Sequence, residues 1–287
     1  MARLLKATEV NAAMREQIIR SVAELRTRGI VPALAIIRVG ERPDDLAYER
    51  GAIRRCEETG VVAERFLLPA CVDQGTLLAV IDGINNDPRF NGCLIFRPLP
   101  EHIDDEAVRQ HLNHTKDIDC ITDGSLVGVF TNTPSGFPSC VVQACIEILD
   151  HYQVDLTGKR VTVVGRSLVV GKPLSMILLA RNATVTICHT RTKDMERCCR
   201  EADVLLVAAG KAGLIGAEHL SADQIVIDVG INFTEDGKMV GDVRFEEAEP
   251  IVAGITPVPG GVGAVTTMVL VKHVVEAARR QNGWVEG

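Results

Sequence analysis

Apolar residues recur at helical and strand-like intervals along the first part of the chain. One helical face is indicated by residues three and four positions apart, which end before Gly29: Val10, Met14, Ile18, Val22 and Leu25. A strand is indicated by ALAIIRVG, followed by a helix over about 44–59, a strand in RFLLP, a helix in LLAVIDGINN and a strand in GCLIFRPLP. This alternation predicts a parallel or mostly parallel sheet covered by helices.

A second series of strands follows a change in composition. The segment TNTPSGFPS (131–139) is rich in Pro, Ser, Thr and Gly and is typical of a loop or domain junction. After a helix in VVQACIEILDHY, four strands are indicated, in KRVTVV, ATVTIC, DVLLVAAG and IVIDVGI, and 266–281 is again helix-like. We therefore expect an α/β fold of two domains with a ligand cleft between them. The first spans 1–138, with the C-terminal helix (267–287) packing back on it, and the second, Rossmann-like, spans 139–266.

The segment LTGKRVTVVGRSLVVGKPLSMILLARN (156–182) carries the strongest chemical signal. A short apolar strand runs into Gly165, Arg166 and Ser167, and Gly171 then opens an amphipathic helix. Glycines permit a tight turn and close approach to a ligand, and the free N–H groups at a helix start bind an anion. The pattern predicts the phosphate site of a dinucleotide. Its spacing differs from G-x-G-x-x-G, so an ordinary strand–turn–helix is the alternative interpretation.

The next strand ends at the sequence His189-Thr190-Arg191-Thr192. In nucleotide folds this position meets the adenosine ribose, where NAD users place an acid and an Arg accommodates the 2′-phosphate of NADP. No acid occurs here until Asp194. Thr190 and Arg191 therefore favour NADP, with a solvated loop cation as the alternative for Arg191.

Composition excludes several classes of partner. A length of 287 residues fits about two domains. The net charge of −7 and the 3% aromatic content argue against nucleic acid or an anionic membrane as main partners. No apolar stretch approaches the roughly 20 residues of a membrane span, and MARLLKATEV lacks the apolar core of a secretion signal. Nine cysteines without a C-x-x-C pair predict neither a disulfide framework nor a zinc site, and Cys198 and Cys199 are interpreted as packing residues. We expect a cytoplasmic, reduced protein without a metal.

Several motifs around GRSLVVGKP occur together in the order of one known family. They are RPLP (97–100), KDID (116–119), IDVGIN (227–232), GDV (241–243) and ITPVPGGVG (255–263). With them the chain resembles the methylenetetrahydrofolate dehydrogenase/cyclohydrolase family over nearly its whole length. The resemblance implies a homodimer, an NADP cofactor and a tetrahydrofolate-type substrate. In the family, one step passes a hydride from the methylene carbon of the substrate to NADP, and a second adds water to the methenyl form to give 10-formyltetrahydrofolate.

The resemblance also implies the residues of both ligand sites. Asp119 matches the acid that grips the pterin ring, whose N–C–N edge offers two parallel donors to a carboxylate. Tyr48 matches the tyrosine that packs on the substrate, and these two are the implied catalytic residues. The implied substrate-binding positions are Tyr48, Ala52, Ile95, Phe96, Arg97, Asp119, Pro259, Gly260 and Gly261. The implied cofactor-binding positions are Gly165, Arg166, Ser167, Gly171, Thr190, Arg191, Ile231 and Thr266.

The chain departs from the family on the folate side. In the motif Y-x-x-x-K that begins at Tyr48, the catalytic lysine position holds Ala52, and Phe96 replaces the glutamine that orients this lysine. A general base contributes about 10²–10⁴-fold to a rate, and alanine supplies none of it. Asp45, Glu49 and Cys120 also stand where the family has Ser, Val and Gly.

A cation near the missing lysine could supply fixed charge but no base. Arg55 lies three residues beyond Ala52 on the same helical face, and arginine does not deprotonate in proteins. A surface cation is the alternative interpretation of Arg55. Arg97 is expected to point to the opposite side of its strand from Phe96.

Three functions remain open from the sequence. The favoured one is NADP-dependent oxidation of 5,10-methylenetetrahydrofolate with weak or absent cyclohydrolase activity, because hydride transfer needs orientation of two carbons and no obligatory base. The altered folate side suggests a dehydrogenase acting on a modified pterin or another one-carbon adduct. The third is a non-catalytic folate- or nucleotide-binding paralogue.

Overall fold

The computed structural model describes residues 1–284 and contains two compact units. The six-stranded unit comprises 1–11 and 141–266, and the three-stranded unit comprises 12–140 and the described residues from 267. The sequence-based division had assigned 1–11 to the other domain. These residues belong to the six-stranded unit because β1 (Arg3–Leu4) pairs in parallel with β11 (Gly254–Ile255).

The sheet of the six-stranded unit is parallel throughout. Its order is β1, β11, β8 (Ile225–Asp228), β7 (Val204–Val207), β5 (Arg160–Val164) and β6 (Thr184–Cys188). The chain passes from β5 to β6 on one side and then to β7 on the other, so the strand order reverses at β5. In doubly wound sheets, ligands bind beyond the carboxyl ends of the strands at such a point. The expected Rossmann-like domain is confirmed.

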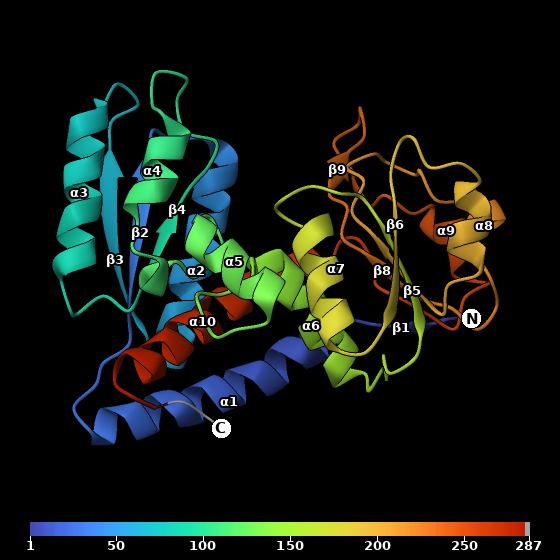
Figure 1. Ribbon diagram of the computed structural model, residues 1–287, viewed down its shortest axis with the longest axis horizontal. Coiled ribbons are helices and arrows are strands. Elements are labelled where there is room, and N and C mark those ends of the chain that lie inside the picture. The colour runs from blue at the N-terminus through green and yellow to red at the C-terminus, as the bar shows by residue number, and fades with distance from the viewer. Residues whose placement is uncertain (285–287) are drawn as a thin grey trace. The chain divides into compact units, whose positions relative to one another are not determined.

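Short helices and one hairpin complete this unit. Helix α7 (Gly171–Ala180) packs against β5 and β6, and α8 (Met195–Arg200) contacts β6 (Figure 1). The remaining elements are α6 (Cys140–His151), α9 (Phe245–Ala248), two 3-10 turns (Ala217–His219 and Val262–Ala264) and the antiparallel pair β9 (Asn232–Phe233) and β10 (Met239–Val240).

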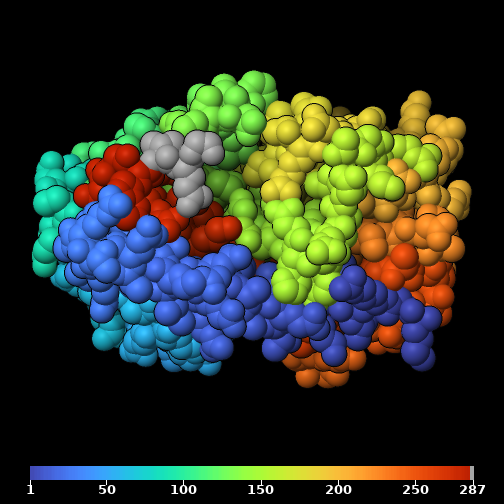
Figure 2. All heavy atoms as spheres, turned by 90° about the horizontal axis from the view of Figure 1, so that it is seen from below, coloured from blue at the N-terminus to red at the C-terminus, as the bar shows by residue number. Residues whose placement is uncertain are grey.

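The three-stranded unit has a parallel sheet in the order β3 (Val62–Leu68), β2 (Ala33–Val39) and β4 (Gly92–Ile95). Every residue of the central β2 is buried, in keeping with a sequence that is apolar except at Arg38. The helices are α1 (Ala7–Thr27), α2 (Pro43–Thr59), α3 (Gln74–Asn86), α4 (Asp105–His111), α5 (Asp123–Thr131) and α10 (Thr266–Gln281), with a 3-10 turn at His114–Lys116. In Figure 2 the blue surface of α1 lies beside the red surface of α10, and Arg279 pairs with Glu24 across them at 3.0 Å.

The helices predicted from the sequence are confirmed, and several short elements of the structure were not predicted. The sequence predicted the helices that became α1, α2, α3, α6, α7 and α10 and a helical stretch at Cys198 and Cys199 that became α8, and the junction at 131–139 joins α5 to α6. It did not predict α4, α5, α9 or the hairpin, because these short elements show too little apolar periodicity. Among residues 1–284, no helix is both long and apolar enough to cross a membrane.

One backbone position offers a test of local strain. Gln153 follows the end of α6, is exposed and has a φ of +57°, in the left-handed region that favours glycine. We expect Gln153→Gly to raise the free energy of unfolding by about 1 kcal/mol, because the Cβ strain is removed. Denaturant titration measures the change. As a control, Gln17→Gly, on the exposed face inside α1, should lower stability by about 1 kcal/mol. An equal loss of stability in both variants would contradict strain at Gln153.

Candidate functional site

The glycine turn after β5 is forced by close backbone contacts. Gly165 has a φ of +127°, and a Cβ there would lie 2.2 Å from the carbonyl oxygen of Ala208, just beyond β7. A Cβ on Gly171 would lie 2.2 Å from the carbonyl oxygen of Gly165. The hydroxyl of Ser167 accepts the N–H of Val170 at 3.1 Å, immediately before α7. The turn therefore lies where the strand order reverses and leads directly into a helix start.

The loop after β6 adjoins this turn. The N–H of Gly165 donates to the carbonyl of Cys188 at 2.9 Å, which joins the ends of β5 and β6. Within the loop, the N–H of His189 donates to the hydroxyl of Thr192 at 2.8 Å, and the N–H of Arg191 donates to His189 Nδ1 at 3.1 Å. The structure thus brings the predicted phosphate turn and the predicted ribose loop together.

Cations in this region are accessible and uncompensated. Arg166, Thr190 and Arg191 are exposed. Within residues 1–284, neither Arg166 nor Arg191 forms an ion pair with an acid. Asp194, the first acid after β6, pairs instead with Arg197 at 3.2 Å. The region therefore presents free positive charge to an anion.

Several of the other implied ligand-binding positions line a cavity of about 260 Å³. Ile231 and the loop Pro259, Gly260 and Gly261 line it together with Asp228. Gly260 has a φ of +100°, and a Cβ on Gly261 would lie 2.5 Å from the carbonyl oxygen of Pro257, so both glycines are required by the turn. Thr266 lies outside this lining, and its hydroxyl donates to the carbonyl of Gly263 at 3.0 Å.

Two buried aspartates hold the loops around that cavity through hydrogen bonds to main-chain N–H groups. No role for either was predicted from the sequence. The carboxylate of Asp228 accepts the N–H groups of Gly230, Asp242 and Val243, each at 3.0 Å. Burial raises the pKa of Asp228 to about 6. The carboxylate of Asp242 accepts three N–H groups, from residues 209, 210 and 211, at 2.7 to 2.9 Å. The available signal was an acid inside each of the motifs IDVGIN and GDV.

In the three-stranded unit, α2 and the end of β4 supply the implied substrate positions. The rings of Tyr48 and Phe96 meet edge to face, with centroids 6.0 Å apart and planes at 82°. Ala52 is fully buried, so the expected lysine position is closed to solvent. Ile95 packs in the hydrophobic core of this unit. An aromatic pair with a buried alanine therefore occupies the positions where the resemblance implies Tyr, Lys and Gln.

The unusual acid on α2 has a partner in the sheet. Glu49 forms a buried ion pair with Arg38 of β2 at 2.8 Å, and Arg65 lies 3.5 Å from its other oxygen. Burial raises the pKa of Asp45, one turn earlier on the helix. The side chain of Arg55 is 19% exposed and pairs with Glu58 on its own helix at 2.8 Å, so its charge is already engaged by an acid.

The KDID segment folds into a loop that presents Asp119. The carboxylate of Asp117 accepts the N–H groups of Asp119, Ile121 and Thr122 at 2.8 to 3.2 Å. The ammonium of Lys116 donates to the carbonyls of residues 84 and 87 at 2.6 and 2.7 Å. Lys116 and Asp117 are therefore positioning residues, which the sequence analysis did not identify.

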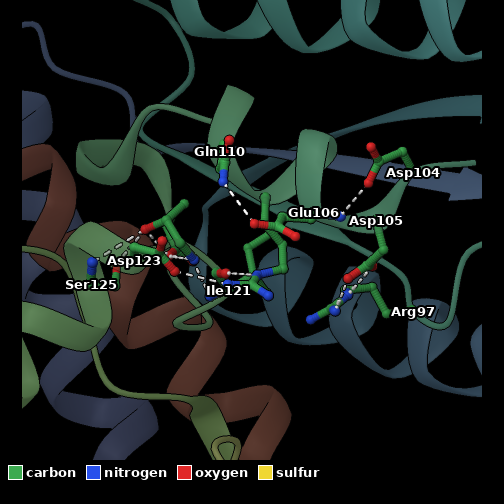
Figure 3. Close-up of polar contacts among 11 residues, drawn as sticks. Arg97, Asp104, Asp105, Glu106, Gln110, Ile121, Asp123 and Ser125 are labelled. Carbon is green, nitrogen blue, oxygen red and sulfur yellow. Dashed lines mark hydrogen bonds and ion pairs between the residues drawn. The ribbon is translucent and has the colours of Figure 1, made fainter.

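Asp119 is a partly buried carboxylate with one main-chain donor. The N–H of Cys140 donates to it at 2.7 Å. Burial raises its pKa to about 6, against the opposing effect of the Arg97 charge. Arg97 is exposed and Phe96 buried, although both lie beyond the end of β4, where strand alternation does not apply, and the guanidinium of Arg97 bonds to Asp105 on α4 (Figure 3). His273 of α10 holds the preceding residue through its Nδ1, which lies 2.8 Å from the carbonyl oxygen of Ile118.

A parallel sheet with a glycine turn at its reversal point defines the class of dinucleotide-binding α/β proteins, and comparison with known proteins defines the family. Residues 5–119 match the tetrahydrofolate dehydrogenase/cyclohydrolase catalytic domain, and residues 139–282 match the tetrahydrofolate dehydrogenase/cyclohydrolase NAD(P)-binding domain. The chain belongs to this family of enzymes. The predicted family and the nicotinamide nucleotide cofactor are thereby confirmed.

Individual relatives cover almost the whole chain. It is 48% identical over 287 residues to the bifunctional protein FolD of Carboxydothermus hydrogenoformans, covering 99% of this chain and 100% of that protein. The structure of the bifunctional enzyme FolD of Campylobacter jejuni is similar with a TM-score of 0.94 and 35% identity, covering 98% and 100% of the two chains. The Trypanosoma brucei enzyme, solved with NADP and an inhibitor, is similar with a TM-score of 0.91 and 31% identity, covering 98% and 99%.

Proposed function

We propose that the protein oxidises 5,10-methylenetetrahydrofolate to the methenyl form with NADP and has weak or absent cyclohydrolase activity. The observation that carries the proposal is a contrast between the units. The six-stranded unit has its glycine turn and accessible cations in place, whereas α2 of the three-stranded unit has a buried alanine at the lysine position. The six-stranded unit would bind the cofactor and the three-stranded unit the folate.

The cofactor is assigned as NADP from the charge of the ribose loop. Arg166 and Arg191 are exposed without an acidic partner in the described chain, and no carboxylate lies between Cys188 and Asp194. An acid there would bond the 2′-hydroxyl of NAD, whereas free guanidinium groups bind a 2′-phosphate. The relative from Trypanosoma brucei, described in complex with NADP, supports this assignment.

The folate is assigned from Asp119 and Tyr48. One carboxylate oxygen of Asp119 accepts the N–H of Cys140, and a pterin would present two further donors to the carboxylate. Tyr48, whose ring packs edge to face on the buried Phe96, would supply an aromatic face for a flat ring. Hydride transfer then depends on holding the methylene carbon against the nicotinamide and needs no base from position 52.

The loss of hydrolysis is proposed from the chemistry of position 52. Hydrolysis of the methenyl form requires a proton acceptor for water, and Ala52 and Phe96 offer neither a base nor a hydrogen bond. The relatives named above are called bifunctional or FolD, so this feature would set the chain apart from them. The buried Arg38–Glu49 pair ties the altered helix α2 to strand β2.

One assay tests the proposal. Purified protein is mixed with NADP and methylenetetrahydrofolate, and NADPH and the methenyl product are followed separately. We expect NADPH and methenyl to accumulate together at equal rates. Prompt conversion of methenyl to the formyl product would refute the loss of hydrolysis. Binding of both ligands without turnover would favour a non-catalytic paralogue, and NADP binding without folate binding would favour a modified pterin as substrate.

Cofactor preference has its own test. We expect Arg191→Ala to weaken NADP binding about 10-fold or more while the dissociation constant of NAD changes little, because one charge-assisted bond to a phosphate contributes about 1.5–3 kcal/mol. Titration calorimetry with each nucleotide measures both constants. Arg197→Ala is the matched control, since Arg197 is engaged by Asp194. Equal weakening of both nucleotides by Arg191→Ala would count against a 2′-phosphate contact.

We also propose that the protein is a homodimer, as the family resemblance implies. Sedimentation equilibrium at micromolar concentration tests this, and a monomer mass would reject it.

A further inference from the structure

The loop after β6 is a tight turn over residues 189–192 that is closed by its own hydrogen bonds. The N–H of Thr192 donates to the carbonyl of His189 at 2.8 Å, and the N–H of His189 donates to the hydroxyl of Thr192 at 2.8 Å. The N–H of Arg191 donates to Nδ1 of the His189 ring at 3.1 Å. His189 therefore takes part in every one of the bonds that hold the turn.

The donors that remain for a ligand belong to the two central residues of this turn. Within residues 1–284, neither the N–H nor the hydroxyl of Thr190 forms a hydrogen bond, and the guanidinium of Arg191 bonds to no other side chain. Both residues are exposed, whereas His189 is half-buried. The turn thus holds three of its main-chain N–H groups internally and leaves the donors of Thr190 and the charge of Arg191 accessible to an anion.

The contact between the His189 ring and Arg191 has the form of an Asx turn. In such turns a side-chain oxygen of Asn or Asp accepts the N–H two residues further on and fixes the backbone between them. The His189 Nδ1 occupies the place of that oxygen, since both atoms are bonded to Cγ. Because a main-chain N–H can only donate, Nδ1 is the acceptor and the proton of the neutral ring is on Nε2.

The turn is also attached to the glycine turn after β5. The N–H of Gly165 donates to the carbonyl of Cys188, the residue directly before His189, at 2.9 Å. Arg166, the other accessible cation, directly follows Gly165. Hydrogen bonds on both sides of His189 therefore fix the backbone of Arg191 relative to the glycine turn.

We propose that His189 is a positioning residue for the 2′-phosphate of NADP: its Nδ1 holds the main chain of Arg191, so that the Arg191 guanidinium and the donors of Thr190 meet one phosphate group. The inference rests on the proposed NADP function and adds a residue that acts through its neighbours. A backbone that is already ordered loses less conformational entropy when the phosphate binds. NAD has no phosphate at this position and gains little from the same order.

The experiment measures the dissociation constants of NADP and NAD by titration calorimetry on the full-length protein. We expect His189→Leu, which has no acceptor, to weaken NADP about fivefold and NAD less than about twofold, as for the loss of one ordinary hydrogen bond. His189→Asn restores an acceptor on Cγ and should return NADP affinity to within about twofold of the unaltered protein.

Two further variants keep the comparison interpretable. His189→Gln moves the acceptor one methylene further from the backbone and should behave like His189→Leu, so it replaces that variant if the leucine protein does not fold. His151→Leu, at the end of α6 in the same unit, is the matched control and should change neither constant. Circular dichroism verifies that each variant is folded.

The outcomes separate this inference from the proposed cofactor. If the unaltered protein binds NADP no more tightly than NAD, the cofactor assignment is wrong and the role of His189 is rejected with it. If NADP is preferred and His189→Leu keeps the full preference, the role of His189 alone is rejected. Equal weakening of both nucleotides would assign His189 to the fold of the turn only. A loss in His189→Leu that His189→Asn does not restore would mean that the ring contacts the cofactor directly, which also overturns the positioning role.

Discussion

The double variant Ala52→Lys with Phe96→Gln is expected to hydrolyse the methenyl product at least about 10²-fold faster than the unaltered protein, because a positioned general base contributes about 10²–10⁴-fold. Ala52 is fully buried and Phe96 nearly so. A lysine introduced alone would be desolvated beside an aromatic ring, which lowers its pKa and gives its ammonium no acceptor. The glutamine amide supplies that acceptor, so the pair should succeed where the single change fails. Loss of methenyl absorbance from added methenyltetrahydrofolate measures the rate.

Two comparisons make this result interpretable. Ala52→Met with Phe96→Gln has a side chain of similar length without an amine, and it should remain inactive in hydrolysis. Ala52→Lys alone should be less stable than the double variant. If the double variant folds and keeps its dehydrogenase activity but gains no hydrolysis, the two substitutions do not explain the missing activity. The wider pocket, including Asp45 and Glu49, would then be responsible.

Asp119→Asn is expected to lower kcat/KM for the folate about 10²-fold while the NADP dissociation constant stays unchanged. An asparagine offers one acceptor and one donor where the pterin edge presents two donors, so it loses a charge-assisted bond and opposes a second donor, a loss of about 3 kcal/mol. Initial rates at varied folate concentration measure the effect. Asp123→Asn, an exposed carboxylate paired with Arg109, is the control and should have little effect. Equal kcat/KM in Asp119→Asn and Asp123→Asn would show that Asp119 does not bind the folate.

The same substitution should stabilise the protein above pH 6. Burial raises the pKa of Asp119 from 3.8 to about 6, so the folded state disfavours the charged carboxylate. The stability linked to this group is fully present below pH 3.8 and is lost as the pH rises through about 6. At pH 8 the neutral asparagine avoids that loss and should raise the free energy of unfolding by roughly 2–3 kcal/mol. Stability lower than that of the unaltered protein at pH 8 would contradict a burial penalty.

Substrate binding at Asp119 should follow the opposite pH trend. Only the charged carboxylate accepts both pterin donors, so KM for the folate should rise as the pH falls through about 6. A residue that is retained for function at a cost in stability shows this pair of opposite effects. Asp119 can therefore be distinguished from a residue that serves the fold alone.

Periodicity predicted the parts of the fold that are long and regular. The buried β2 and the helix α10 stand out because seven and sixteen residues carry a continuous or repeating pattern. The attachment of residues 1–11 to the six-stranded unit could not be predicted, because β1 has only two residues and its pairing with β11 joins distant parts of the chain. Local pattern contains no information on such a pairing.

The site was predictable where chemistry is carried by residue type at a fixed spacing. Gly165 and Gly171 lie where a Cβ would collide with the backbone. The presence of glycine at these positions therefore indicates the tight turn. Asp228 and Asp117 escaped notice because their carboxylates bond to main-chain N–H groups, which every residue except proline possesses. The engagement of Arg55 by Glu58 likewise depends on side-chain conformation, which spacing does not specify.

The two carboxylates of Asp228 and Asp242 have an evolutionary consequence. Between them they accept N–H groups from residues 209–211, 230 and 242–243, and a further bond from the Asn232 side-chain amide. Most of these bonds involve the backbone, so side chains of the loops that make no close contact are free to vary while the loop paths persist. Substitution of either aspartate would release several segments at once. Sequence drift on this side of the molecule is therefore constrained chiefly at the two acids and at the glycines packed against them, Gly230 and Gly241, and ligand preference can diversify without a change of fold.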